Sequence, residues 1–144
     1  MDRLFLDANV LFSAAYRPDS RLRELWTRPE TALVTSPFAL EEARRNLLVY
    51  APEALPALEA LVTGVTVLVT EAVVTTVLHD VDLPDKDLPI LSAAVAGQCT
   101  HLITGDARHF GPLYGHREKG VLVVTPSQYL RGGGTAGLAA DERG

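Results

Sequence analysis

Cysteine is almost absent from this sequence, since Cys99 is the only one in 144 residues. A single thiol cannot close an internal disulfide, and a zinc site would need histidine or carboxylate ligands instead. We therefore interpret the chain as a protein of a reducing, cytoplasmic compartment.

A long uninterrupted apolar segment is also missing. Residues 88–105 carry no formal charge, but Pro89, Gly97 and Gln98 break their apolar character, so no membrane-spanning helix is predicted and we expect no membrane partner. Near the N-terminus, Asp7 interrupts what would be the apolar segment of a signal peptide. The sequence therefore predicts a protein that is not exported.

An excess of positive charge is lacking as well. The formal net charge is −5, which argues against a protein that coats nucleic acid through its overall charge. A local basic patch remains compatible with this balance.

The length suits one compact domain with a single core, because 47% of the residues are hydrophobic. We assign residues 1–130 to that domain. Residues 131–144 read RGGGTAGLAADERG, which is too polar and too rich in glycine to pack, so we expect a disordered tail.

Short apolar runs alternate with amphipathic segments along the domain. The pattern predicts strands at 3–7, 32–36, 65–70, 100–105 and 121–125, and helices at 8–16, 19–26, 37–50, 52–62, 88–97 and 126–130. Residues 71–81 fit either a strand or a helix. Strands and helices that alternate in this way indicate an α/β fold, a three-layer α/β/α sandwich with a central, mainly parallel sheet.

Four carboxylates stand out by their positions relative to these elements. Asp7 ends the predicted strand 3–7, and Asp106 follows the predicted strand 100–105. Glu42 lies in the predicted helix 37–50, and Asp87 lies at the start of the predicted helix 88–97. Each has a plain structural interpretation, because acidic residues commonly cap helices or face solvent. Their joint placement at the carboxyl ends of parallel strands, where such sheets bind ligands, favours a shared site.

Two of these assignments have close competitors. Glu41 lies four residues before Arg45 and suits a surface ion pair, whereas Glu42 borders the apolar stripe of its helix and is the better ligand. Asp87 is nearest the start of its helix, and we keep Asp85 as the alternative.

The sequence resembles the PIN-domain ribonucleases, which include toxins of bacterial toxin–antitoxin pairs. The segments that carry the resemblance are LDANVLFSA, SPFALEEARRNL, DLPILSAA and LITGDARHFGPL, in the family's order and spacing. The resemblance implies endonucleolytic cleavage of RNA phosphodiesters with Mg²⁺ or Mn²⁺, by a water that the metal activates. The catalytic acids would be Asp7, Glu42, Asp87 and Asp106, with Asp7, Asp87 and Asp106 as the metal ligands.

Further roles are implied by the same resemblance. Asn9 and Thr104 match polar positions of the motifs and would support the acids. An antitoxin protein and a homodimer are implied as partners, and the apolar helices 37–50 and 52–62 suit a dimer interface. Among the basic residues, we expect Arg108 and His109 to contact RNA phosphates, whereas Tyr50 is interpreted as helix packing.

The residues themselves support a hard divalent cation. Several carboxylates close together raise one another's pKa unless a cation neutralises them, and oxygen ligands suit Mg²⁺ or Mn²⁺. One alternative is a catalytically silent PIN-like domain that binds RNA or a protein. Another is a phosphate-accepting signalling domain, although the acidic pair and the late lysine that such a domain needs are not evident.

Overall fold

The computed structural model describes residues 1–69, 83 and 87–132, and these form a central six-stranded sheet in the order β3-β2-β1-β4-β6-β5. All neighbouring strands are parallel except β5, which pairs antiparallel with β6. The strands are β1 (Asp2–Leu6), β2 (Thr31–Thr35), β3 (Thr66–Val67), β4 (His101–Ile103), β5 (Arg117–Glu118) and β6 (Val121–Val124).

Helices connect and cover these strands. They are α1 (Ala8–Tyr16), α2 (Pro37–Tyr50), α3 (Leu55–Val62), α4 (Leu88–Ala96), α5 (Ala107–Phe110) and α6 (Pro126–Gly132), with 3₁₀ turns η1 (Arg21–Trp26), η2 (Pro52–Ala54) and η3 (Gly111–Leu113). The start of α2 illustrates how the sequence sets an element. Pro37 occupies the first turn, and the Ser36 hydroxyl accepts a hydrogen bond from the backbone N–H of Ala39.

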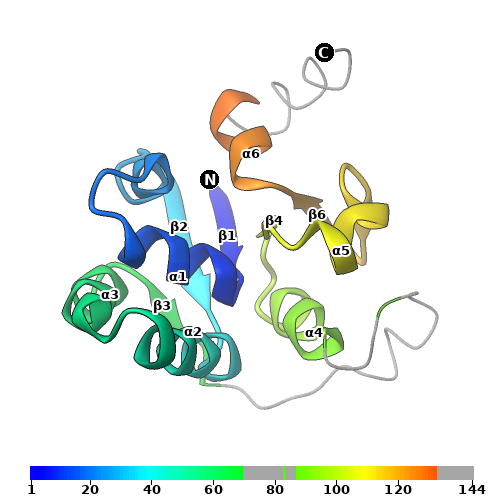
Figure 1. Cartoon of the computed structure of the whole chain (residues 1–144). Helices are drawn as coiled ribbons and strands as arrows, with labels where there is room; N and C mark the ends of the chain where they lie inside the picture. The colour runs from blue at the N-terminus through cyan, green and yellow to red at the C-terminus, as the bar shows by residue number, and fades with distance from the viewer. Residues whose placement is uncertain (70–82, 84–86, 133–144) are drawn as a thin grey trace.

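The chain reverses its direction along the sheet between β3 and β4. It moves outward from β1 through β2 to β3 and returns to the other side of β1 as β4. It then runs to the edge strand β5, from which β6 turns back to lie between β5 and β4. Since parallel crossovers are nearly always right-handed, the connections before and after the switch cover opposite faces. In Figure 1, α1 and α3 lie to the left of the central strands and α4 and α5 to their right. The predicted three-layer, mainly parallel α/β fold is therefore confirmed.

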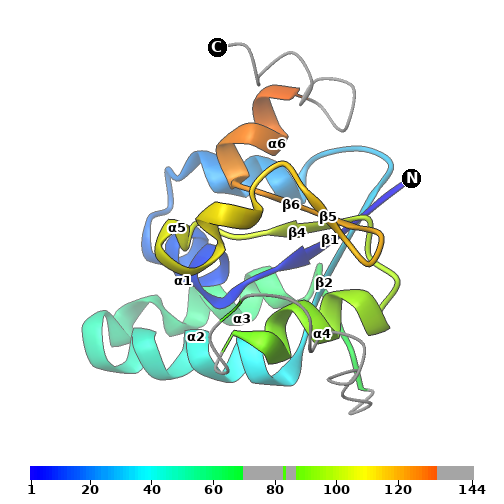
Figure 2. The same cartoon turned by 90° about the vertical axis from the view of Figure 1, so that its right-hand side faces the viewer.

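Helix α2 links the two groups of helices, because it contacts α1, α3 and α4. The view turned by 90° shows α2 and α4 together below the strands (Figure 2). Helix α2 therefore contacts helices from both faces of the sheet.

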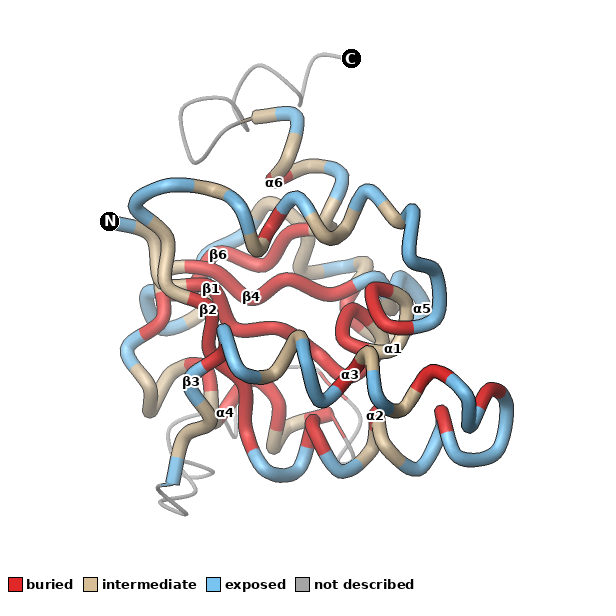
Figure 3. The backbone as a smooth tube through the Cα atoms, turned by 90° about the vertical axis from the view of Figure 1, so that its left-hand side faces the viewer, coloured by how far each residue is buried: buried red, intermediate tan, exposed pale blue. Residues whose placement is uncertain are grey.

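The central strands supply the core. Leu4, Phe5 and Leu6 of β1 are completely buried, as are Leu102 and Ile103 of β4. Figure 3 shows the same burial along β2 and β6, while α2 exposes its outer face. Strands covered on both faces need apolar side chains at successive positions, which explains the absence of alternation in these segments.

The structure differs from the prediction in several short elements. The segment 21–26 forms a 3₁₀ helix, β3 pairs only over Thr66–Val67 of the predicted 65–70, and α5 and β5 were not predicted. Helix α6 continues to Gly132, two residues beyond the predicted end of the domain. Residues 71–81 and 133–144 lie outside the described part of the chain. Within that part, no helix is long and apolar enough to cross a membrane.

Helix α6 is anchored to the amino end of β1 by a tyrosine. Tyr129 is 3% exposed, and its hydroxyl donates a hydrogen bond of 2.6 Å to the Asp2 carboxylate. The ring packs edge-on against His101, and the Arg28 guanidinium donates to the carbonyl of Leu130 in the next position. These contacts hold α6 against the amino end of β1 and the loop before β2.

We expect Tyr129→Phe to lower the free energy of unfolding by about 1–2 kcal/mol, because it removes a hydrogen bond to a charged acceptor and keeps the ring. Chemical denaturation measures the change, and the half-exposed Tyr16→Phe serves as the control. An unchanged stability would show that the hydroxyl contributes nothing to docking of α6.

Candidate metal centre

Asp7 lies at the point where β1 ends and α1 begins. One carboxylate oxygen, Oδ1, accepts a hydrogen bond of 2.7 Å from the backbone N–H of Ala8, as a helix cap does. The other oxygen, Oδ2, accepts hydrogen bonds from the Thr104 hydroxyl at 2.8 Å and the Asn9 amide at 3.1 Å. A cap alone does not need this second set of donors.

Asn9 and Thr104 join the loops after β1 and β4. The Asn9 side-chain oxygen accepts a hydrogen bond of 2.8 Å from the backbone N–H of Gly105. The Thr104 hydroxyl also accepts one of 3.1 Å from the backbone N–H of Asp106. These two residues, which the sequence singled out as supporting, therefore fix the relative positions of Asp7 and Asp106.

Burial dominates the electrostatics of Asp7, which is 6% exposed. The net pKa of its carboxyl is raised from 3.8 to about 6; loss of hydration is the largest cause, and the nearby charge of Glu42 acts in the same direction. Hydrogen bonds from Thr104, Ala8 and Asn9 lower the pKa and offset part of this effect. A nearby cation would restore the charged form.

The imidazole of His109 lies between the carboxylates of Asp87 and Asp106. Asp106 caps α5, and His109 Nδ1 lies 2.8 Å from its Oδ2. The same Nδ1 lies 3.1 Å from Asp87 Oδ2. Asp87 occupies the N-cap position of α4, but its side chain makes no capping hydrogen bond there. Capping therefore does not account for the Asp87 carboxylate.

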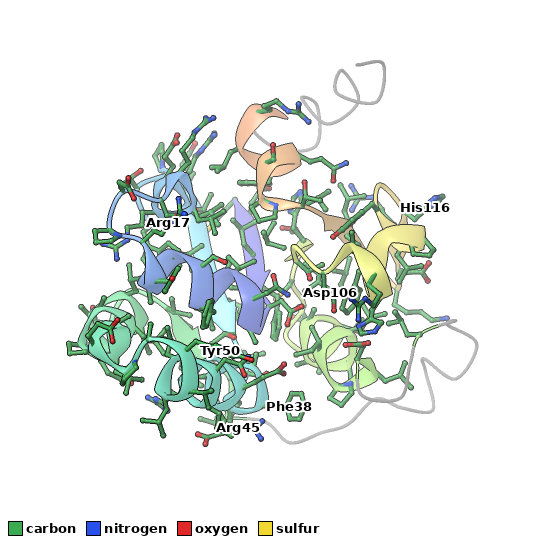
Figure 4. The ribbon with its side chains drawn as sticks, in the orientation of Figure 1. Arg17, Phe38, Arg45, Tyr50, Asp106 and His116 are labelled. Atoms are coloured by element: carbon green, nitrogen blue, oxygen red, sulfur yellow. The ribbon has the colours of Figure 1, made fainter. Side chains whose placement is uncertain are left out.

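All four predicted acids line one cleft of about 510 Å³ at the carboxyl ends of β1 and β4. Glu42 enters it from α2, while the neighbouring Glu41 is exposed. Figure 4 shows Asp106 on the α5 side and Tyr50 on the α2 side. The remaining lining residues are Asn9, Phe12, Ser13, Asn46 and Ile90.

The donor set fits a hard divalent cation. Carboxylate oxygens are the preferred ligands of Mg²⁺ and Mn²⁺, and a buried carboxylate with a raised pKa is the group that such an ion would neutralise. Ligand atoms of Asp87, Asp106 and His109 lie within 4.8 Å of one another. The competing acid Asp85 lies outside the described residues.

Some residues have surroundings that the sequence did not indicate. The ring of His109 contacts two acids, and Arg108 is exposed to solvent; that both contact RNA phosphates stays a prediction. Tyr50 was interpreted as packing, but it is 74% exposed at the rim of the cleft. The spacing Asp106 to His109, three positions along a helix, is the signal that could have paired those two residues.

We expect Asp7→Asn to stabilise the metal-free protein at neutral pH. Because the folded-state pKa of about 6 exceeds the usual 3.8, folding takes up a proton between those values, and stability falls as pH rises through them. The gain should be small near pH 4, about 0.5 kcal/mol, and reach at most about 3 kcal/mol at pH 7.

Denaturation with EDTA across this pH range measures the effect, with the exposed Asp19→Asn as the control. A D7N variant that is equally destabilised at both ends of the range would contradict this account of the buried charge.

Comparison with solved structures identifies proteins of the same fold. The chain is similar to the structure of VapBC2 from Rickettsia felis bound to a promoter DNA fragment (TM-score 0.64, 15% identity, 85% of this chain and 98% of that chain covered). It is also similar to VapBC-1 from nontypeable Haemophilus influenzae (TM-score 0.61, 17% identity, 87% and 98% covered).

A third similar structure is VapC20 from Mycobacterium tuberculosis, described as a toxin that cleaves the sarcin–ricin loop. Its TM-score is 0.54 at 18% identity, with 72% of this chain and 91% of that chain covered. At these low sequence identities, the similarity shows a shared fold. No curated protein matches the sequence significantly.

The sequence itself matches a family profile described as the PIN domain over residues 3–108. The matched region is well over half of the chain and contains Asp7, Glu42, Asp87 and Asp106. The chain therefore belongs to the PIN domain family.

Proposed function

We propose that this protein is a divalent-metal-dependent endoribonuclease. The observation that carries the proposal is the convergence of Asp7, Glu42, Asp87 and Asp106 on one cleft from four separate segments of the chain. An acidic cleft of this kind is unsuited to RNA phosphates unless a cation lies between them. The phosphate-accepting alternative draws no support from this geometry.

Each residue has a distinct part in the proposed reaction. Asp7, Asp87 and Asp106 would hold Mg²⁺ or Mn²⁺, which when bound supplies an activated water and offsets charge on the phosphate. Thr104 and Asn9 keep Asp7 oriented through hydrogen bonds to its Oδ2. Glu42, which lines the same cleft from α2, would orient a water or accept its proton. Arg108 is exposed and lies two residues after Asp106 in the sequence, which makes it a candidate contact for the RNA backbone.

The biological setting is proposed from the similar structures. Two of them are VapBC structures and the third is described as a toxin that cleaves the sarcin–ricin loop, so we propose that this protein is the cytoplasmic toxin of a toxin–antitoxin pair. An antitoxin that occupies the acidic cleft would then control the activity.

We expect the purified protein to cleave single-stranded or looped RNA with Mn²⁺ or Mg²⁺, and EDTA to abolish the cleavage. Gel analysis of labelled RNA measures both. Robust cleavage in chelator by a clean preparation contradicts metal dependence. Binding of RNA without cleavage in either metal favours the catalytically silent alternative.

We expect Asp87→Asn to reduce cleavage at least about a hundredfold, because even residues behind a metal's ligands change activity 10–100-fold. The melting temperature in EDTA should be unchanged or higher, since the side chain does not cap α4 and its charge is removed. The stabilisation by added Mn²⁺ should shrink, because it depends on affinity for the folded state.

Asp19→Asn, on an exposed turn, is the matched control for the loss of one carboxylate. If activity and the Mn²⁺ response of D87N both persist, the third acid is Asp85 and the assignment of Asp87 is wrong.

We also propose a homodimer that uses the outer face of α2. Leu48 and Val49 are 62% and 73% exposed, which is unusual for two adjacent apolar side chains. Light scattering at micromolar concentration should give about twice 15.5 kDa. The variant with Leu48→Glu and Val49→Lys should be monomeric with an unchanged fold, and a monomeric parent contradicts the proposal.

A further inference from the structure

His109 lies between two of the acids in the candidate metal centre. Its Nδ1 is 2.8 Å from Asp106 Oδ2 and 3.1 Å from Asp87 Oδ2. The backbone N–H of the same residue donates a hydrogen bond of 3.3 Å to Asp106 Oδ1, so the first turn of α5 fixes the imidazole beside the carboxylate.

This imidazole is not a solvated surface group, because its side chain is only 19% exposed. Its Nδ1 faces both carboxylates. This nitrogen, one oxygen of Asp87 and one oxygen of Asp106 all lie within 4.8 Å of one another, close enough to bind the same cation. An imidazole that served only to contact RNA would not need to point at either acid.

We propose that His109 supplies Nδ1 as a nitrogen ligand to the cation held by Asp87 and Asp106, an inference that rests on the proposed metal-dependent function. Coordination uses the lone pair of the neutral ring, so the ring proton resides on Nε2 in the bound state. Both ions prefer oxygen, but Mn²⁺, as a transition metal, accepts an imidazole ligand more readily than Mg²⁺, which takes oxygen ligands almost exclusively. The site should therefore prefer Mn²⁺ to Mg²⁺ through His109.

A different role for the same ring makes the opposite prediction. If His109 is an imidazolium that stands in for the cation, it competes with the metal for Asp87 and Asp106. Removing it would then leave Mn²⁺ affinity unchanged or increase it. Removing a ligand decreases that affinity, so the direction of one measurement separates the two roles.

The direct experiment is pulsed electron paramagnetic resonance of Mn²⁺ bound to the intact protein. Coordination by His109 is expected to give a ¹⁴N hyperfine coupling that disappears in His109→Ala. His116→Ala is the matched control, because this other histidine is exposed and lies at the outer edge of the molecule, away from Asp106 (Figure 4).

Affinities provide the second measurement. We expect His109→Ala to weaken Mn²⁺ binding at least about tenfold, since loss of residues behind the ligands already costs 10–100-fold. Mg²⁺ binding, measured by competition with Mn²⁺, should change much less, so the preference for Mn²⁺ should fall. Circular dichroism melts of both variants in EDTA establish that they fold.

The outcomes separate this inference from the function on which it rests. Mn²⁺ that binds and supports RNA cleavage without ¹⁴N coupling overturns the role of His109 and leaves the nuclease intact. Unchanged or tighter Mn²⁺ binding by H109A also overturns it. A parent protein that binds no Mn²⁺ and cleaves no RNA overturns both.

Discussion

The hydrogen bond from the Thr104 hydroxyl to Asp7 Oδ2 joins the ends of the two strands between which the chain reverses its direction along the sheet. Beyond that point the connections leave on opposite faces, which opens a crevice at the carboxyl edge. Asp106 lies two residues after Thr104, and its backbone N–H donates to the same hydroxyl. The position of the acidic cleft thus depends on the side chain of Thr104, which together with Asn9 holds two loops together.

At Asp7, the burial that fixes the carboxylate for its proposed function also lowers the stability of the fold. Burial of Asp7 raises its pKa, which means that the charged carboxylate is a cost to the folded protein without a cation. The strand and cap that surround Asp7 keep it in place despite that cost. Charged groups that destabilise the fold yet remain fixed are typical of functional sites.

Local chemistry made several features predictable. Ser36 and Pro37 define the start of α2, and Asp7 comes after a run of residues that only a buried strand accommodates. Short elements were harder, because two pairing residues in β3 and the turn of helix at α5 carry almost no periodic signal. Their form depends on neighbours that are distant in the sequence.

The same distinction applies to the candidate site. Asp7 and Asp106 could be predicted as site residues because each lies at the end of a strand, and the loops that leave parallel strands all begin at the same carboxyl edge of the sheet. The approach of His109 to Asp87 could not be predicted in this way, because it depends on how α4 packs beside α5. Tyr50 was misinterpreted because the sequence pattern of an aromatic residue on the buried face of a helix is the same as that of one at its exposed end.

The strand order has a consequence for how the protein is made. β1 leaves the ribosome about a hundred residues before its partner β4, so one edge of β1 stays unpaired until β4 emerges. Thr104 comes directly after β4. A nascent chain therefore cannot assemble its acidic cleft until most of it has been synthesised, and every truncated product that ends before β4 lacks Thr104, one of the two residues that orient Asp7.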